Sequence, residues 1–255
     1  MTERGISGAI VAAALAALLA AGCGGGRTHG VAGARVTLAP RCAAGLHRPV
    51  GSARVSWAAF VVRPAFAYRA PGRARIARFG LLNANGVSTV FGVIGEQVDA
   101  RCRPRWLHVL LPLRPNGATG WVRASHVQLV RLRTRIVVDL SERRVSFYKR
   151  GRLVLTSTAA VGSSATPTPL GRYYVNQRLI PRDPGGPFGP GAVGISAFSP
   201  VLTGWTQGGP IAIHGTNEPW SIGRAVSNGC IRLPNAVLRK LFAQTPSGTP
   251  VLIRR

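Results

Sequence analysis

The sequence predicts a mainly β protein of two domains, on three observations. Glycine and proline are frequent (32 and 19 of 255 residues) and scattered, as expected where turns join many short strands. Several short runs alternate apolar and polar side chains, which is the period of a half-buried strand. A convincing helical stripe follows Pro234, so we expect one or two short helices. The 46% apolar content excludes a disordered or fibrous chain.

The first domain is expected over residues 55–131, after a linker or N-terminal extension at 24–54 that lacks periodicity. Strand-like runs at 59–62, 88–93 and 106–111 are separated by Pro- and Gly-rich turns. The stretch WLHVLLPLRPNGATGWVRASHVQL resembles the end of a bacterial SH3-like small barrel. Its Trp106 and Trp121 are interpreted as buried core, with stacking on a ligand as the alternative. Its His108 and His126 are interpreted as ordinary strand residues, because no metal-ligand spacing surrounds them.

A second β-rich domain is expected over residues 135–255. Its predicted strands lie at 136–140, 145–148, 153–161, 172–179, 210–214 and 251–253. The helix after Pro234 carries an apolar stripe and ends before Pro246.

The N-terminus has the pattern of an export signal over residues 1–23. Arg4 precedes an apolar run at 6–21 that is short for a membrane span. The run ends in LAAGC, which resembles a bacterial lipoprotein signal with Cys23 as the lipid attachment site. Ordinary secretory cleavage and an uncleaved anchor are the alternatives. We therefore expect an exported envelope protein, anchored on the outer side of the cytoplasmic membrane.

Three further cysteines follow, an odd number for an oxidising compartment, which suggests one free reactive thiol. Cys42 and Cys102 are the candidate disulfide, although two unpaired cysteines are also compatible with the sequence. Cys230 is the candidate free thiol.

The net charge of +26 is almost entirely arginine. The arginines are dispersed, whereas a nucleic-acid-binding protein usually concentrates them in a tail or helical stripe. We interpret the charge as arginine-biased codon usage with weak attraction to anionic surfaces, and expect no nucleic-acid partner.

The chemistry concentrates in IAIHGTNEPWSIGRAVSNGCIRL, residues 211–233. A thiol becomes a strong nucleophile only as a thiolate, so Cys230 needs a base or a positive field. His214 supplies the base and Arg232 adds positive potential. Gly229 allows close backbone approach, so amides near Cys230 can face an oxyanion.

HGT and the following S-x-G-C-I-R come after the Thr168-Pro169-Leu170-Gly171 turn. Together these motifs resemble the signature of the L,D-transpeptidase family (YkuD-type catalytic domain). The resemblance covers about 120 residues. It implies that Cys230 attacks a peptidoglycan tetrapeptide stem and forms a thioester, with His214 as base. A second stem then resolves the thioester as a 3→3 crosslink, without metal or cofactor.

The resemblance also assigns the neighbouring residues. The Gly215 carbonyl orients the imidazole, and the amides of Gly229 and Cys230 form an oxyanion hole. Site-shaping or substrate-binding roles fall to Ser227, Asn228, Arg232 and Thr216. For Arg232 a structural ion pair is an equal alternative, and for Ser227 loop organisation is favoured over direct chemistry. Glu218 is interpreted as an exposed loop carboxylate.

Two other functions remain open from the sequence. Water instead of an amine would make the protein an L,D-carboxypeptidase. A fold retained without activity would make it a wall-binding lipoprotein.

Overall fold

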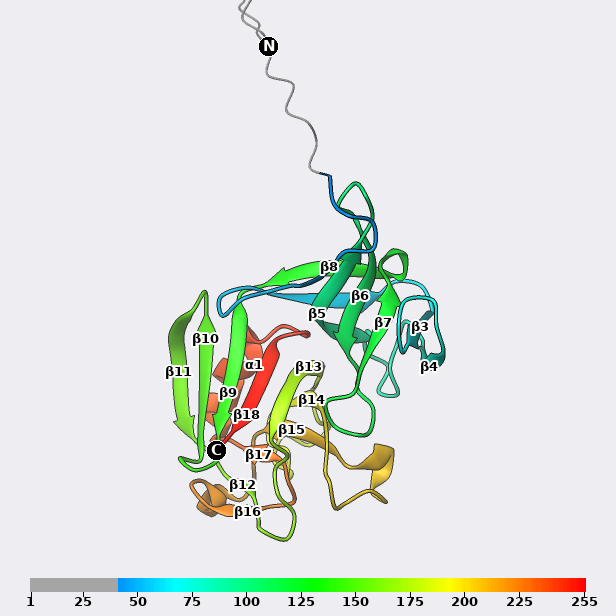
Figure 1. Ribbon diagram of the computed structural model, residues 1–255. Helices are drawn as coiled ribbons and strands as arrows, with labels where there is room; N and C mark the ends of the chain where they lie inside the picture. Colours follow the sequence, from blue (N-terminus) through cyan, green and yellow to red (C-terminus); the bar gives the residue numbers. More distant parts are fainter. Residues whose placement is uncertain (1–40) are drawn as a thin grey trace, which may run out of the picture. The chain divides into compact units, whose positions relative to one another are not determined.

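The computed structural model describes residues 41–255, so the predicted signal segment and Cys23 lie outside the described residues. Within them, two eight-stranded sheets and one two-stranded sheet hold nearly all regular structure (Figure 1). The prediction of a mainly β chain with few helices is confirmed. No helix in this part of the chain is long and apolar enough to span a membrane.

The first sheet is antiparallel throughout, in the order β4-β3-β7-β6-β5-β2-β8, with β1 paired to β5. Its strands are β1 (His47–Pro49), β2 (Ser56–Val61), β3 (Ala65–Tyr68), β4 (Arg75–Phe79), β5 (Val90–Val98), β6 (Pro104–Leu110), β7 (Thr119–Arg123) and β8 (Val127–Leu132). A 3-10 turn, Ala124–His126, joins the last two.

The core of this sheet is made of alternate residues that face inward, including Phe91, Leu107 and Val109. Strand β1 lies inside the segment expected as linker, because three exposed residues carry no periodicity that a sequence pattern could show. The likeness of this region to an SH3-like barrel stays a prediction.

The second sheet has the order β11-β10-β9-β18-β13-β14-β15-β17. Its strands are β9 (Thr134–Asp139), β10 (Arg144–Lys149), β11 (Arg152–Thr158), β13 (Gly171–Leu179), β14 (Ala192–Phe198), β15 (Pro210–His214), β17 (Ile231–Arg232) and β18 (Pro250–Arg254). Strands β9 and β18 are parallel, as are β15 and β17. A separate parallel pair joins β12 (Val161–Gly162) to β16 (Ala225–Ser227).

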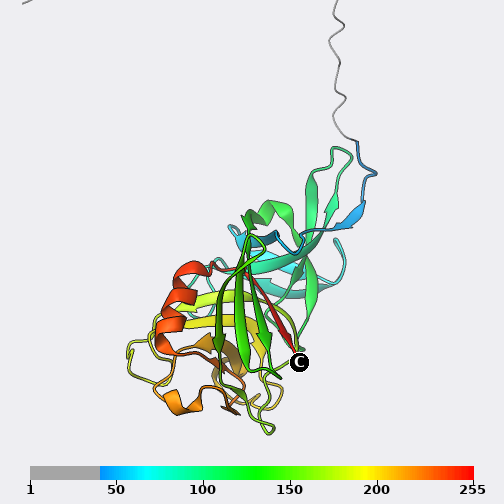
Figure 2. The ribbon, with the colours of Figure 1, turned by 90° about the vertical axis from the view of Figure 1, so that its left-hand side faces the viewer.

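Helix α1 (Asn235–Gln244) covers one face of the second sheet (Figure 2). Its Leu238 and Leu241 are fully buried against strand residues such as Ile213 and Ile231. Two 3-10 turns, Thr206–Gly208 and Pro219–Ser221, lie in the loops around β15. The apolar helix stripe and the inward strand residues therefore form one core that holds β15 and β17 in place.

Tyr174 of β13 packs onto the first sheet. It shares a buried cluster with Ala58, Val90 and Leu132, and it lies directly over Gly92 of β5. Its neighbour Tyr173 belongs to the core of the second sheet, as expected for alternating strand residues.

Candidate active site

His214 is the last residue of β15 and is almost completely buried, with 4% exposure. Ile213 beside it points into the core, so the imidazole points to the opposite face of the sheet. The core thus fixes the direction of the histidine.

Cys230 directly precedes β17, which pairs with β15 in parallel so that His214 lies opposite Arg232. Cys230 lies two residues before Arg232, so its side chain is on the same face as those of Arg232 and His214. This offset corresponds to about 8 Å between the Cα atoms of Cys230 and His214. The imidazole and thiol side chains can bridge this spacing. Two residues 16 positions apart in the sequence are thereby brought together by one parallel strand pair.

The His214 ring is held by a short hydrogen bond from Nδ1 to the Gly215 carbonyl, at 2.5 Å. A carbonyl only accepts, so the ring proton lies on Nδ1 and the lone pair on Nε2. Burial lowers the pKa of His214 to about 4, with Arg232 acting in the same direction and the Gly215 bond opposing it. The ring is therefore neutral near pH 7, with a basic nitrogen available. The contact expected with Gly215 is present.

Phe188 contacts the same imidazole edge-on, with ring centroids 5.0 Å apart. It lies in a loop rich in proline and glycine between β13 and β14 and is half-exposed. The sequence analysis missed this residue, because nothing in the spacing of the loop connects it to the histidine.

Cys230 is partly exposed and has no disulfide partner within residues 41–255. Burial raises the pKa of its thiol, whereas a backbone hydrogen bond from Ala212 and the charge of Arg232 lower it. The resting pair is thus a neutral thiol beside a neutral imidazole, which requires proton transfer as the thiol attacks.

The turn before the cysteine is organised by Ser227. Its hydroxyl donates to the Cys230 carbonyl at 2.5 Å and accepts from the Gly229 amide at 3.2 Å. The loop-organising interpretation of Ser227 agrees with these contacts. The Gly229 amide donates to this hydroxyl in the resting site. The amide could therefore stabilise an oxyanion only after it exchanges the Ser227 hydroxyl for the oxyanion as acceptor. Gly229 has φ +106°, a conformation that favours glycine.

The threonine-proline segment supports the same turn from the other side. Thr168 donates to the Gly229 carbonyl at 2.9 Å, and Thr166 donates to the Ser227 carbonyl at 2.9 Å. The Thr168-Pro169-Leu170-Gly171 turn thus has a physical connection to the cysteine that its sequence alone does not give.

Arg232 lies beside the pair and donates through Nη1 to Glu218. The ion pair expected as one alternative for Arg232 is therefore present. Glu218 is a loop carboxylate with a partly exposed side chain, and the ion pair with Arg232 is the contact that the sequence did not show. An ion pair that joins residues 14 positions apart in a loop leaves no periodic signal in the sequence. The Nε atom of Arg232 is buried and has no partner among the described residues.

Thr216 is held by Asn235, the first residue of α1. The Asn235 amide accepts from the Thr216 N–H at 2.8 Å and donates to the Thr216 carbonyl at 3.0 Å. A Cβ on Gly215 would collide with the same amide oxygen. Asn235 is a second residue that sequence reasoning missed, and it explains why the HGT segment needs glycine.

The remaining candidates are more exposed. Asn228, at the centre of the cysteine turn, is exposed, and Trp205 and Trp220 are more than half exposed. Cys42 and Cys102 form a disulfide, so the pairing that the sequence left open is confirmed. No cluster of three or more metal-binding side chains occurs within residues 41–255.

The part of the chain that holds this site is similar to known L,D-transpeptidases. Residues 133–253 match the family model described as the YkuD L,D-transpeptidase catalytic domain. The protein of Bacillus licheniformis named as a candidate L,D-transpeptidase YkuD is 43% identical over 119 residues, covering 47% of this chain and 64% of that protein. Its Bacillus subtilis counterpart is 39% identical over 120 residues, covering 47% and 65%. The chain therefore spans slightly less than two thirds of these relatives.

The catalytic domain of the E. faecium L,D-transpeptidase is similar in structure, with 27% identity, a TM-score of 0.35, and coverage of 48% of this chain and 96% of that one. The family model and the Bacillus relatives support the family resemblance for residues 133–253, and an SH3-like domain before them is not tested by these matches.

Proposed function

We propose, on the premise that residues 133–253 match the L,D-transpeptidase catalytic domain, that this chain is a peptidoglycan L,D-transpeptidase with Cys230 as nucleophile and His214 as base. The single observation that carries the proposal is the arrangement of the two residues. A free thiol lies on the same sheet face as a buried imidazole whose proton is fixed on Nδ1 by Gly215.

In the proposed first step, Nε2 of His214 takes the thiol proton as Sγ attacks the carbonyl before the terminal D-alanine of a tetrapeptide stem. The C–N bond breaks, the proton passes to the departing D-alanine amine, and a thioester remains on Cys230. An amine of a second stem then attacks the thioester, returns Sγ as leaving group and gives a 3→3 crosslink.

Other groups of the site assist these steps. Arg232 adds positive potential beside the thiol and offers its unpartnered Nε to a substrate oxygen. The Cys230 amide, together with the Gly229 amide once Ser227 releases it, would stabilise the oxyanion. These steps use no metal or cofactor.

Export, lipid attachment at Cys23 and residence at the cell wall are part of the same proposal. Their evidence is the sequence of residues 1–23 and the substrate class, since a peptidoglycan substrate is reached only outside the cytoplasm.

The test is incubation of the purified chain with disaccharide-tetrapeptide, with products read by mass spectrometry. We expect a dimer that lacks one D-alanine. Cys230→Ala and His214→Ala should abolish it, while His126→Ala should leave it unchanged, because His126 lies in the 3-10 turn between β7 and β8 and binds the Pro64 carbonyl. Tripeptide alone would identify an L,D-carboxypeptidase instead. Unreacted substrate with every variant would favour the binding-protein alternative.

A carbapenem supplies an independent check, because the family resemblance implies that such β-lactams acylate the nucleophile. Intact-mass analysis should show one adduct on the unmodified chain and none on Cys230→Ala. An equal adduct on both would contradict the assignment of Cys230.

A further inference from the structure

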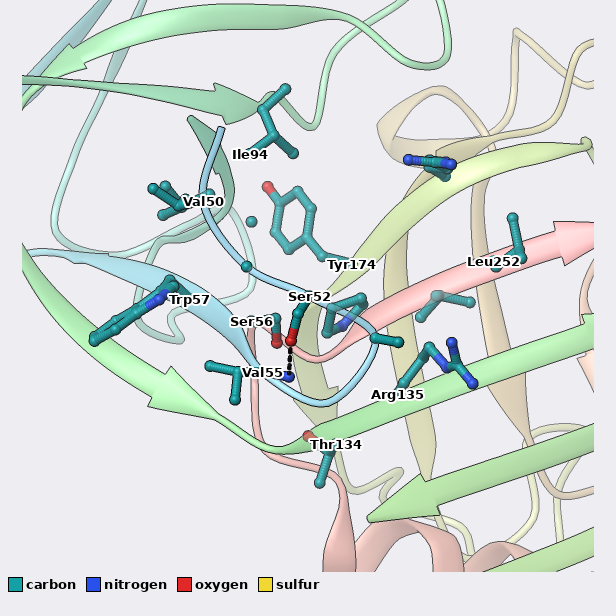
Figure 3. Close-up of a pocket in the computed structure, with 18 of the residues that line it drawn as sticks. Val50, Ser52, Val55, Ser56, Trp57, Ile94, Thr134, Arg135, Tyr174 and Leu252 are labelled. Atoms are coloured by element: carbon teal, nitrogen blue, oxygen red, sulfur yellow. Dashed lines mark hydrogen bonds between the residues drawn. The ribbon is translucent and has the colours of Figure 1, made fainter. Parts of the chain in front are cut away.

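A cavity of about 590 Å³ lies away from the cysteine and histidine (Figure 3). Its walls come from residues 49–57, from β5 and from the strands β9, β13 and β18. No residue of the 211–233 segment lines it. Its volume is within the range of about 300–1,000 Å³ typical of small-molecule sites.

Three lining residues each carry a buried polar atom without a hydrogen-bond partner among the described residues. These atoms are Ser56 Oγ, Arg135 Nε and the Tyr174 hydroxyl. Tyr174 is fully buried, and Figure 3 shows its hydroxyl pointing toward Ile94 rather than toward another polar group. A buried donor left unsatisfied costs free energy, so three around one cavity indicate that a ligand supplies their partners.

The cavity is positively charged. Its lining contains four arginines and no acidic residue: Arg54, Arg133, Arg135 and Arg172. None of them takes part in the ion pairs found in residues 41–255. A neighbouring hollow shares Arg54 and Gly151 and adds Lys149, Arg150 and Arg152. This concentration of unpaired cations favours an anionic ligand.

The rest of the wall is apolar, and includes Val50, Trp57, Ile94, Leu110 and Leu252. A small inorganic anion would leave this surface without contact. An apolar molecule would leave the arginines and the three buried polar atoms without partners. The two halves of the lining together fit a ligand with both characters.

We propose that this cavity is a second ligand site, which binds an amphiphilic anion. Its carboxylate or phosphate head accepts hydrogen bonds from the lining arginines, Arg135 among them. The Tyr174 and Ser56 hydroxyls line the part of the cavity nearer the first sheet, since β18 separates Tyr174 from Arg135. The aliphatic body of the ligand lies against Val50, Trp57 and Ile94. The proposal does not depend on the transpeptidase reaction.

Calorimetric titration of the full chain with four probes tests the class of ligand. Octyl phosphate and octanoate carry both features, 1-octanol carries the body alone, and inorganic phosphate carries the head alone. We expect the two amphiphilic anions to bind at least about 10-fold more tightly than the other two. The tighter of the two anions identifies the head group. Equal affinity for octanol, or no binding of either anion, would overturn the proposal.

Two pairs of variants locate the binding. Tyr174→Phe removes an unpartnered hydroxyl of the cavity wall, so the thermal stability should be equal or higher while the affinity falls, by less than in Arg135→Gln. Tyr173→Phe is its control: Tyr173 also borders the cavity, but its hydroxyl donates to the Leu170 carbonyl, so stability should fall and affinity should not.

Arg135→Gln should weaken binding more strongly than Tyr174→Phe. Arg123→Gln is matched to it, because Arg123 stacks on Trp106 at 4.7 Å as Arg135 stacks on Tyr148 at 4.6 Å, but lies outside the cavity. Folded Tyr174→Phe and Arg135→Gln proteins that bind octyl phosphate as tightly as the unmodified chain would contradict the site.

Discussion

The first and second sheets contain the same two reactive residue types, cysteine and histidine, in opposite arrangements. In the first region Cys42 and Cys102 are consumed in a disulfide, whereas Cys230 in the second is free. His108 of the first sheet stacks flat on Trp121, at 4.7 Å between centroids, and His214 contacts Phe188 edge-on.

Burial lowers the pKa of both histidines, with His47 contributing at His108. A lowered pKa and an aromatic neighbour therefore do not distinguish a catalytic imidazole. The difference lies in the remaining contacts: His214 alone has its tautomer set by a carbonyl next to it and a thiol on the neighbouring strand. Four predictions test this contrast.

The largest expected effect is loss of reaction. Cys230→Ala should reduce the rate of dimer formation by at least about 1,000-fold, since the nucleophile is removed. The double variant Cys42→Ala, Cys102→Ala should retain the rate of the unmodified chain at a temperature where it is folded. Initial rates measured by mass spectrometry decide this, and a comparable loss in both variants would remove the distinction between the regions.

The free energy of unfolding should respond in the reverse order: the double alanine variant of Cys42 and Cys102 should lose more of it than Cys230→Ala. The disulfide joins residues 60 positions apart. Its removal in the double alanine variant should lower the free energy of unfolding by about 4 kcal/mol, because the unfolded chain regains loop entropy. Urea denaturation measures the change, with Cys230→Ala as control. An unchanged midpoint in the double variant would show that the first sheet does not depend on the bond.

The two histidines should give different pH dependences of stability. The pKa of His214 is about 4 in the folded state, below the usual 6.5. Between these values the unfolded chain binds more protons, so stability is lost as the pH falls and is regained as it rises. The loss is at most about 3 kcal/mol. His214→Gln should remove most of this slope in urea denaturation between about pH 4 and pH 7.

His108→Gln is the matched variant for that experiment. Its pKa is lowered in the same direction by burial, but it is less completely buried than His214, so a smaller part of the slope should disappear. A larger change for His108 than for His214 would mean that the imidazole beside Cys230 is not the more strongly desolvated one.

The smallest effect concerns the charge next to the thiol. Arg232 lowers the pKa of Cys230, so Arg232→Gln should slow alkylation by iodoacetamide near neutral pH by about threefold. Glu218→Gln leaves Arg232 uncompensated and should accelerate it. Arg224→Gln changes an exposed charge of the same loop and serves as control. Identical alkylation rates for all variants would show that the charge of Arg232 does not affect the reactivity of Cys230.

Local patterns in the sequence predicted the elements that carry the site. The strand 210–214 and the helix after Pro234 were expected almost at their observed limits, because alternation and an apolar stripe are local features. His214 and Cys230 were identified from a short motif for the same reason.

The partners of these residues were not predictable in this way. Glu218, Asn235 and Phe188 reach the site only through the tertiary fold, and their sequence distances match no local period. Tyr173 and Tyr174 are both buried, on opposite faces of β13, because a core lies on each side of this strand. A pattern of alternating apolar residues cannot indicate a strand that is buried on both faces.

Strand β18 has a consequence for how the molecule forms. It lies between β9 and β13, pairs with both, and follows β9 by more than one hundred residues. During synthesis the hairpin partners β9, β10 and β11 emerge long before the strand that joins them to the cysteine and histidine. The reactive half of the sheet is therefore completed late, through contacts of high sequence separation that form slowly. Cys230 and His214 then acquire their fixed geometry only when nearly the whole region has left the ribosome.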